Sequence, residues 1–319
     1  MKTIPSISSQ INEEEIYKVI DKHFSRLAPY YYRWINSWLI GAYEHFSDID
    51  KYIILIYIIN KDFIFFRKNG LIVNYESFYK DKTLEVDKIS ISDISKDLQI
   101  PKESVRRKVE ELERAGVIKK KGKKIFVDRT GFTTAQANLT LKNMTTLLHE
   151  FNKILKEENI VKKAYQTIEI SDSIKINFSF VWYQFYKLLF IFTNRWRKAF
   201  GDLETFTIGV IVLVNAADNT NFRLKEFNKK KYQVSIQGSD NIGVNAMSLA
   251  EITGIPRATV IRKLKILIKG NILQINKKKL ITVNMTGQSL KMARKLQDQN
   301  ILSLSNFVSR VFNQIKVIN

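Results

Sequence analysis

An internal repeat is the feature that most constrains this fold: the same order of sequence patterns occurs twice, with an offset of about 155 residues. Each copy opens with an aromatic-rich helical pattern, at 30–43 and again at 182–196. An apolar segment with an acidic start follows in both copies, at 48–59 and at 202–214. Acidic residues stabilise a helix N-terminus through the helix dipole, so we predict a helix here. The chain is therefore predicted to contain two copies of one module.

A chain of 319 residues is long enough for two domains, and its 45% of hydrophobic residues can give each a core. Polar stretches at 61–88 and 217–242 lack a helical period, and we predict loops or short strands there. The charged segment 156–172 marks the joint between the copies. The predicted domains are an N-terminal arm or helix (1–29), a first module with flanking helices (30–160), a linker (161–180) and a second module with flanking helices (181–319).

Each copy then shows the pattern of a helix–turn–helix. Ser90 and Asn245 can cap a first helix, because their side-chain oxygens accept hydrogen bonds from the N–H groups of the first turn. Ile-Pro pairs at 100–101 and 255–256 end that helix and open the next, because proline forces the preceding residue into extended geometry. The residues of the first helix predicted to face the core are Ile91, Ile94 and Leu98 in copy one, and Met247, Leu249 and Ile252 in copy two.

The second helix of each pair has an apolar stripe at positions i, i+4 and i+7, which is typical of a helix packed on one side. The stripes are Val105, Val109 and Leu112, and Val260, Leu264 and Leu267. Long cations and small hydroxyls on the other face suit base edges and phosphates in a DNA major groove. The predicted DNA-contacting residues of these helices are Lys102, Glu103, Ser104, Arg106, Arg107 and Lys108, and Arg257, Thr259, Arg262 and Lys263.

A lysine-rich hairpin follows each helix–turn–helix, between β-like flanks, in the position of the wing of a winged helix. Lysines at a hairpin tip can lie along a phosphate backbone and release its counterions. One such hairpin alone could simply be a solvated turn, but the two occupy the same place in both copies. The predicted wing residues are Lys119, Lys120, Lys121, Lys123 and Lys124, and Lys277, Lys278 and Lys279.

The formal charge of +21, from 52 Lys and Arg against 31 Asp and Glu, makes a polyanion the first partner to test. A generally basic, soluble surface is the alternative. The absence of cysteine excludes disulfides and thiolate metal sites. Apolar runs such as 52–60 and 206–217 are too short to cross a bilayer, and the first residues lack the apolar core of an export signal. We expect a cytoplasmic, nucleoid-associated protein without membrane contact.

These residues resemble the winged-helix transcriptional regulators and, more narrowly, the MarR family. The resemblance is carried by the segments 101–105 and 256–260, by the basic wings and by the wing-exit turns at 128–131 and 284–287. It covers most of each half. Members of that family usually have one module per chain and dimerise through terminal helices, whereas this chain holds two modules, with longer inserts. The resemblance therefore implies a monomer that acts as a pseudo-dimer.

Motifs for catalysis or cofactor binding are absent from the sequence, which has no Gly-rich phosphate loop, nucleophile elbow or His-Glu-x-x-His. His23, His45 and His149 are far apart, and we predict that they are ordinary helix residues. Asp48 and Asp50 could hold a divalent ion, but the start of an apolar helix favours a capping role. We expect no enzyme activity, no cofactor and no metal.

The tryptophans at 34, 38, 182 and 196 could line a small-molecule pocket, but we favour the interpretation that they pack between terminal helices. They leave a small-molecule effector possible but unidentified. We predict a mainly α chain with small β-wings, in which two winged-helix domains form a pseudo-twofold, dimer-like unit. The predicted function is sequence-specific binding of double-stranded DNA in transcriptional regulation. The alternatives are a replication initiator of plasmid or phage type and a nucleoid-structuring protein.

Overall fold

The computed structural model describes residues 10–130, 132–217, 226–237, 243–284 and 286–315. The first half contains α1 (Glu13–Lys22), α2 (Phe24–Phe46), α3 (Ile49–Lys68), α4 (Tyr75–Tyr79), β1 (Thr83–Asp87), α5 (Ile91–Leu98), α6 (Lys102–Arg114), β2 (Ile118–Lys121), β3 (Lys124–Asp128) and α7 (Phe132–Glu157). The second half contains α8 (Thr167–Ile176), α9 (Phe178–Phe200), α10 (Leu203–Ala217), α12 (Lys229–Gln237), α13 (Ala246–Thr253), α14 (Arg257–Lys269), β4 (Leu273–Ile275), β5 (Ile281–Val283) and α15 (Gly287–Ile315). The prediction of a mainly helical chain with small β hairpins is confirmed.

The repeat seen in the sequence is present in the order of the elements. Helices α1, α2 and α3 recur as α8, α9 and α10, and α5, α6 and α7 recur as α13, α14 and α15. Even the caps recur, since Asn12 and Gln166 each form a capping box with the glutamate three residues later. Asp48, as predicted, caps α3 by accepting hydrogen bonds from two backbone N–H groups of its first turn. Both copies are therefore built from the same local signals.

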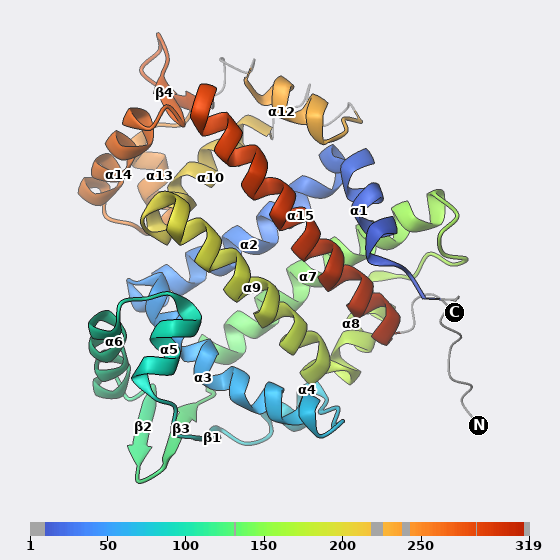
Figure 1. The fold of residues 1–319 in the computed structure, drawn as a ribbon, viewed down its shortest axis with the longest axis vertical. Coiled ribbons are helices and arrows are strands. Elements are labelled where there is room, and N and C mark those ends of the chain that lie inside the picture. Colours follow the sequence, from blue (N-terminus) through green and yellow to red (C-terminus); the bar gives the residue numbers. More distant parts are fainter. Residues whose placement is uncertain (1–9, 131, 218–225, 238–242, 285, 316–319) are drawn as a thin grey trace.

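Helices of each half pack against helices of the other half. Helix α1 packs on α15 and α8 packs on α7, while α2 contacts α10 and α9 contacts α3. Figure 1 shows the long helices side by side through the middle of the molecule. Trp34 of α2, which is fully buried, lies with its ring centroid 5.1 Å from that of Phe185 and 5.4 Å from that of Phe307. The buried side chains of both halves form one continuous hydrophobic core.

The segment 161–180 is not the predicted linker. It contains α8 and the first residues of α9, and Ile170, Ile174 and Phe178 are fully buried. The prediction failed because α8 is short and only two of its residues, four positions apart, face the core. Its other positions make the composition look like that of a solvated connection. The aromatic helix of the first half also begins earlier than predicted, at Phe24 rather than at residue 30.

Short elements occupy the described parts of the polar stretches. In the first stretch α3 continues to Lys68, α4 follows, and β1 pairs antiparallel with β3 to give a sheet of order β1-β3-β2. In the second stretch α12 is formed, and the rest of that prediction falls partly on 218–225 and 238–242, outside the described residues. Strands β4 and β5 pair antiparallel, and a bridge between Val244 and Ile281 stands where β1 stands in the first half.

In the part of the chain described here, every single helix falls short of the length and apolarity needed to span a membrane. Helices α9 and α10 meet that test only together, and they are bent by 93° at their junction.

The shared core predicts one cooperative unfolding transition for both halves. Replacing Trp34 by Ala should lower the free energy of unfolding by about 3–5 kcal/mol, because a fully buried aromatic ring of the first half loses its contacts with Phe185 and Phe307 of the second. Denaturant titration followed by circular dichroism measures this change. The control is Phe65→Ala on the same half, where the ring is exposed and the expected change is within about 0.5 kcal/mol. Two transitions, only one of them shifted by Trp34→Ala, would contradict a shared core.

Candidate nucleic-acid interface

The first helix–turn–helix is formed by α5 and α6. Ser90 caps α5, with its Oγ accepting a hydrogen bond of 2.9 Å from the N–H of Asp93. Gln99 ends the helix in the left-handed conformation, at φ 52°, and the buried Ile100 anchors the turn. Pro101 then precedes α6 with extended geometry. The predicted sequence signals therefore produce the predicted pair of helices.

The second helix–turn–helix is formed in the same way by α13 and α14. Asn245 caps α13 by accepting a hydrogen bond of 2.8 Å from the N–H of Ser248. Gly254 occupies the left-handed position, at φ 68°, that Gln99 occupies in the first copy. Glycine adopts this conformation without the steric cost that other residues meet. Pro256 precedes α14.

One part of the prediction for α13 is wrong. Met247 and Ile252 do not face the core, because 48% and 47% of their surface is exposed. The buried residues of α13 are Leu249 and Thr253. The hydroxyl of Thr253 donates a hydrogen bond of 2.6 Å to the carbonyl oxygen of Leu249, which allows a polar side chain to be buried there.

The apolar stripes of α6 and α14 are buried as predicted. On the opposite face, the exposed residues are Lys102, Glu103, Arg106 and Arg107 in the first copy, and Arg257 and Arg262 in the second. Ser104 and Thr259, at matched positions, are half-buried. Sequence reasoning missed the exposed Lys265 and Lys269 of α14, which continue the face of Arg262 at helical spacing. That spacing is the signal that could have identified them.

A second correction concerns Lys108 of α6 and Lys263 of α14, because both were predicted to lie on the outward face of their helix. Only 8% of the surface of each is exposed. Lys108 forms an ion pair with Asp48, the cap of α3, and Lys263 forms the matched pair with Asp202 before α10. Burial by itself would raise the pKa of Asp202, but the hydrogen bonds from Lys263 and from the backbone of Thr205 bring that pKa below its usual value. These lysines attach each second helix to the body of the protein.

The hairpins place all eight predicted wing lysines on the surface. In the first hairpin, β2 and β3 are joined by a turn at Gly122, which has φ 58°. In the second, the side chain of Asn276 accepts hydrogen bonds of 3.0 Å from the backbone N–H groups of Lys278 and Leu280. That turn holds 277–279 at the tip. Both hairpins therefore present cations to solvent directly behind the second helix.

The two copies differ in how many of these cations are neutralised. Arg106 of α6 lies between Glu103 and Glu110, with its Nη1 donating to the Glu110 carboxylate at 2.6 Å. Lys120 pairs with Glu113 at 2.8 Å, and Lys124 pairs with Asp87 at 2.9 Å. Helix α14, by contrast, has five cationic residues and no carboxylate. The surface of the second copy is therefore the more positive.

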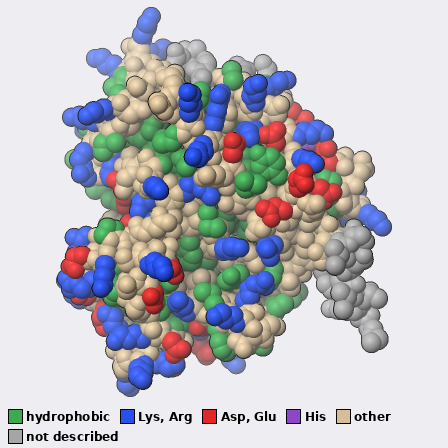
Figure 2. Space-filling view, in the orientation of Figure 1, with side chains coloured by type: hydrophobic (Ala, Val, Ile, Leu, Met, Phe, Trp, Pro, Cys, Tyr) green, Lys and Arg blue, Asp and Glu red, His purple; other side chains and the backbone are tan. Residues whose placement is uncertain are grey.

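Both units lie along one edge of the molecule. In Figure 1, α5 and α6 stand at the left edge with the first hairpin below them, and α13 and α14 stand above with β4 at the top. Figure 2 shows Lys and Arg side chains along that edge and at both hairpin ends, with acidic side chains among those of the lower unit. A linear polyanion could contact both units at once.

Two side chains of α9 hold the first unit against the second half, and sequence reasoning missed them. Arg197 donates a hydrogen bond of 2.6 Å to Asp50 and one of 2.9 Å to the carbonyl oxygen of Leu98. Asn194 donates one of 2.9 Å to the carbonyl oxygen of Asp97. These contacts join residues about 100 to 150 positions apart, and no local pattern indicates them.

The remaining candidates for chemistry have structural partners. Asp48 and Asp50 are engaged by Lys108 and Arg197, which agrees with the predicted capping role. His23 lies 2.8 Å from Glu158, and His149 lies 2.9 Å from the carbonyl oxygen of Tyr165. Among the described residues there is no cluster of three or more His, Asp and Glu that could hold a metal ion.

The Lys263–Asp202 pair makes a prediction about stability and pH. Lys263→Met should lower the free energy of unfolding at neutral pH by about 1 kcal/mol, because the partly exposed Asp202 carboxylate loses its buried partner. The lowered pKa of Asp202 makes the pair stabilising above the usual pKa of an aspartate, and this stabilisation is lost as pH falls through the lowered pKa. Denaturation at several pH values should show the difference from wild type shrinking below about pH 4.

The exposed Lys265 on the same helix provides the control, since Lys265→Met removes the same charge without breaking a buried pair. Equal losses in the two variants, or a Lys263→Met effect that persists in acid, would contradict the assignment of Lys263 to the core.

Similarity to known proteins does not contribute to the assignment of this surface. No family model, curated protein or solved structure matches the chain. The residues and geometry described above are therefore the basis on which a function is proposed.

Proposed function

We propose that the chain is a non-enzymatic protein that binds double-stranded DNA in a sequence-specific way, through two winged-helix modules, and regulates transcription. The observation that carries the proposal is the repeated combination of a helix–turn–helix with a lysine hairpin directly behind it, both along one edge. Helices α6 and α14 would enter major grooves, and the hairpins would follow the phosphate backbone.

The exchange of helices supports a pseudo-twofold arrangement within one chain. The first helix of each half packs on the last helix of the other, α1 on α15 and α8 on α7. The second helix of each half contacts the third helix of the other, α2 with α10 and α9 with α3. A homodimer of one-module chains would use such contacts between subunits. A single chain would then hold both modules on one site, because covalent linkage gives the second contact a high effective concentration.

The two modules would contribute differently to binding. Apart from Lys263, which is buried and paired with Asp202, the cations of α14 have no carboxylate on their own helix and lie on the surface, so they are available to phosphates and bases. Arg106 of α6 is held by two glutamates and must exchange them for DNA. Ala258 and Ile261 stand in α14 where Glu103 and Arg106 stand in α6. The two half-sites are therefore expected to differ in sequence, and the second module to supply more of the affinity.

The first wing gives a test that separates paired from unpaired lysines. Lys119, Lys121 and Lys123 have no ion-pair partner among the described residues, whereas Lys120 and Lys124 do. Replacing the three unpaired lysines by Ala should flatten the salt dependence of binding by about 0.9 log units per lost phosphate contact. Fluorescence anisotropy with a labelled duplex at several salt concentrations measures the slope.

The matched control is the double variant Lys120→Ala, Lys124→Ala, which should change the slope less because those cations are already neutralised. If the triple variant shows the same salt dependence of binding as wild type, the first hairpin does not contact the DNA.

The tandem arrangement predicts one chain on one asymmetric site. Selection from a random duplex pool should yield an imperfect, directional palindrome with half-site centres about 34–36 Å apart. Sedimentation of the complex on that duplex should give one chain per site, since both modules are already present. Two chains on a symmetric site would contradict the pseudo-dimer. A pool without any enriched sequence would instead support a nucleoid-structuring role.

A further inference from the structure

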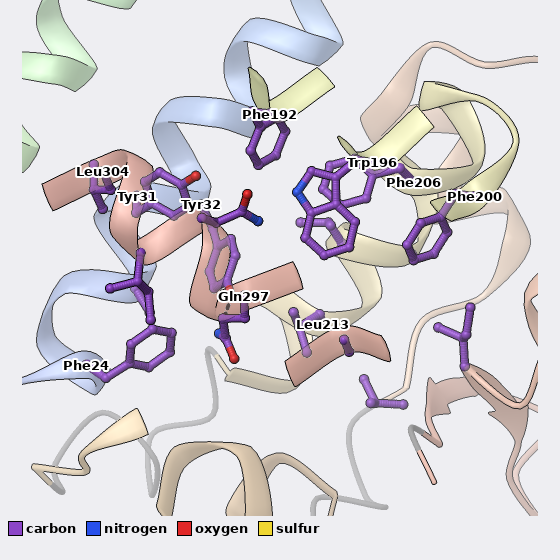
Figure 3. Close-up of a pocket in the computed structure, with 18 of the residues that line it drawn as sticks. Phe24, Tyr31, Tyr32, Phe192, Trp196, Phe200, Phe206, Leu213, Gln297 and Leu304 are labelled. Carbon is purple, nitrogen blue, oxygen red and sulfur yellow. Dashed lines mark hydrogen bonds between the residues drawn. The ribbon is translucent and has the colours of Figure 1, made fainter. Parts of the chain in front are cut away.

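A cavity of about 110 Å³ lies between α2 of the first half and α9, α10, α15 and the base of the second hairpin. Figure 3 shows its aromatic walls, with Phe24, Tyr31 and Tyr32 on one side and Phe192, Trp196 and Phe206 on the other. These side chains come from both halves of the chain, because Tyr31 and Tyr32 belong to α2 and the others named opposite them to α9 and α10. The cavity thus lies where helices of the two halves pack against each other.

Among the described residues that line it there is no Lys, Arg, Asp or Glu. A charged ligand would lose its hydration here without gaining an opposite charge, so the walls select a neutral, mostly apolar molecule. An engineered apolar cavity of about 150 Å³ binds benzene, which sets the size of molecule that such a space accepts. The ligand class is therefore a compound with a single small ring.

Two buried hydrogen-bond donors in this wall lack a protein partner. The hydroxyl of Tyr31 and the indole Nε1 of Trp196 form no hydrogen bond with any described residue. Figure 3 shows the indole nitrogen turned toward the side on which Tyr31 and Tyr32 lie. Burial raises the pKa of Tyr31, which keeps its hydroxyl protonated and able to donate. An unsatisfied buried donor has a free-energy cost that an acceptor on a ligand would remove.

The side-chain amide oxygens of the wall are already engaged. Gln297 donates a hydrogen bond of 3.2 Å to the hydroxyl of Tyr32 and accepts one from Gln233. Asn300 accepts a hydrogen bond of 2.6 Å from Nη1 of Arg195. The hydrogen-bonding capacity that remains in the wall is thus that of donors, which call for an acceptor atom on the ligand.

The matched place in the first half is filled. There, the space among Trp38, Tyr52, Trp182 and Tyr186 is only about 10 Å³. Trp182 stands in α9 where Ala28 stands in α2, and Leu55 stands in α3 where Gly209 stands in α10. Small residues in one copy and large ones in the other leave a cavity on one side. If only packing mattered, both copies would be expected to be filled, as the first is.

We propose that this cavity is a binding site for one neutral, ring-sized apolar molecule that carries a hydrogen-bond acceptor. The acceptor would take a hydrogen bond from the hydroxyl of Tyr31, and the ring would lie between the aromatic walls. The site does not depend on the proposed DNA binding, and its test needs no DNA.

The test compares pyridine, benzene and N-methylpyridinium as probes of one shape. Pyridine has an acceptor nitrogen, benzene has none, and N-methylpyridinium is charged. Ligand-observed NMR titration of the full chain should give saturable, single-site binding of pyridine and benzene in the submillimolar to millimolar range expected for about six heavy atoms. N-methylpyridinium should not bind.

Two variants locate the site. Tyr31→Phe keeps the shape and removes one donor, so it should weaken pyridine about fivefold relative to benzene. The control is Tyr186→Phe. Tyr186 is buried and lines the filled space rather than the cavity, so this change should leave the pyridine-to-benzene ratio unchanged. Ala28→Leu should abolish binding of both probes by filling the space, with its fold checked by circular dichroism.

Absence of saturable binding to the wild type would overturn the proposal. So would binding that survives Ala28→Leu in a folded protein, binding of the charged probe as tightly as pyridine, or the same pyridine-to-benzene ratio in Tyr31→Phe and Tyr186→Phe.

Discussion

The packing of Trp34 against Phe185 and Phe307 shows the constraint on which the molecule depends: each aromatic helix is buried partly by side chains of the other half. Helix α2 packs on α7 of its own half and on α10 of the other, and α9 packs on α15 of its own half and on α3 of the other. Burial of aromatic area is among the largest favourable contributions to folding. The halves are therefore joined into one core, and the positions of both helix–turn–helix units follow from it.

The buried pairs Lys108–Asp48 and Lys263–Asp202 attach those units to the core. In each half the aspartate caps the apolar helix, and the lysine comes from the middle of the second helix of the unit. A cap fixes where a helix begins, so the pair connects that start to the orientation of the second helix. Arg197 adds an attachment in the first half by contacting Asp50 and the end of α5. The proposed DNA-contacting face is therefore held by ion pairs that do not themselves face the DNA.

The two copies agree in framework and differ in surface and cavity. The caps, turns and apolar stripes are shared, because each is needed for the same fold. The carboxylates around Arg106 have no counterpart on α14, and Ala28 and Gly209 leave space that Trp182 and Leu55 fill in the other half. Within one chain the copies can diverge independently, which the identical subunits of a homodimer cannot do.

Local patterns in the sequence determined the caps at Ser90 and Asn245, the Ile-Pro turns, the buried stripes of α6 and α14 and the exposed lysine hairpins, because each depends on residues within one or two helical turns. The tertiary structure alone decided what depends on distant neighbours. The sequence predicts surface positions for Lys108 and Lys263, because it does not show that Asp48 and Asp202 lie beside them in the folded chain. It predicts a core position for Met247, because it does not give the orientation of α13. The helix hidden in 161–180, the contacts of Arg197 and the cavity beside Trp196 likewise depend on which helices the core brings together, and a core assembles residues by shape and burial rather than by their separation along the chain.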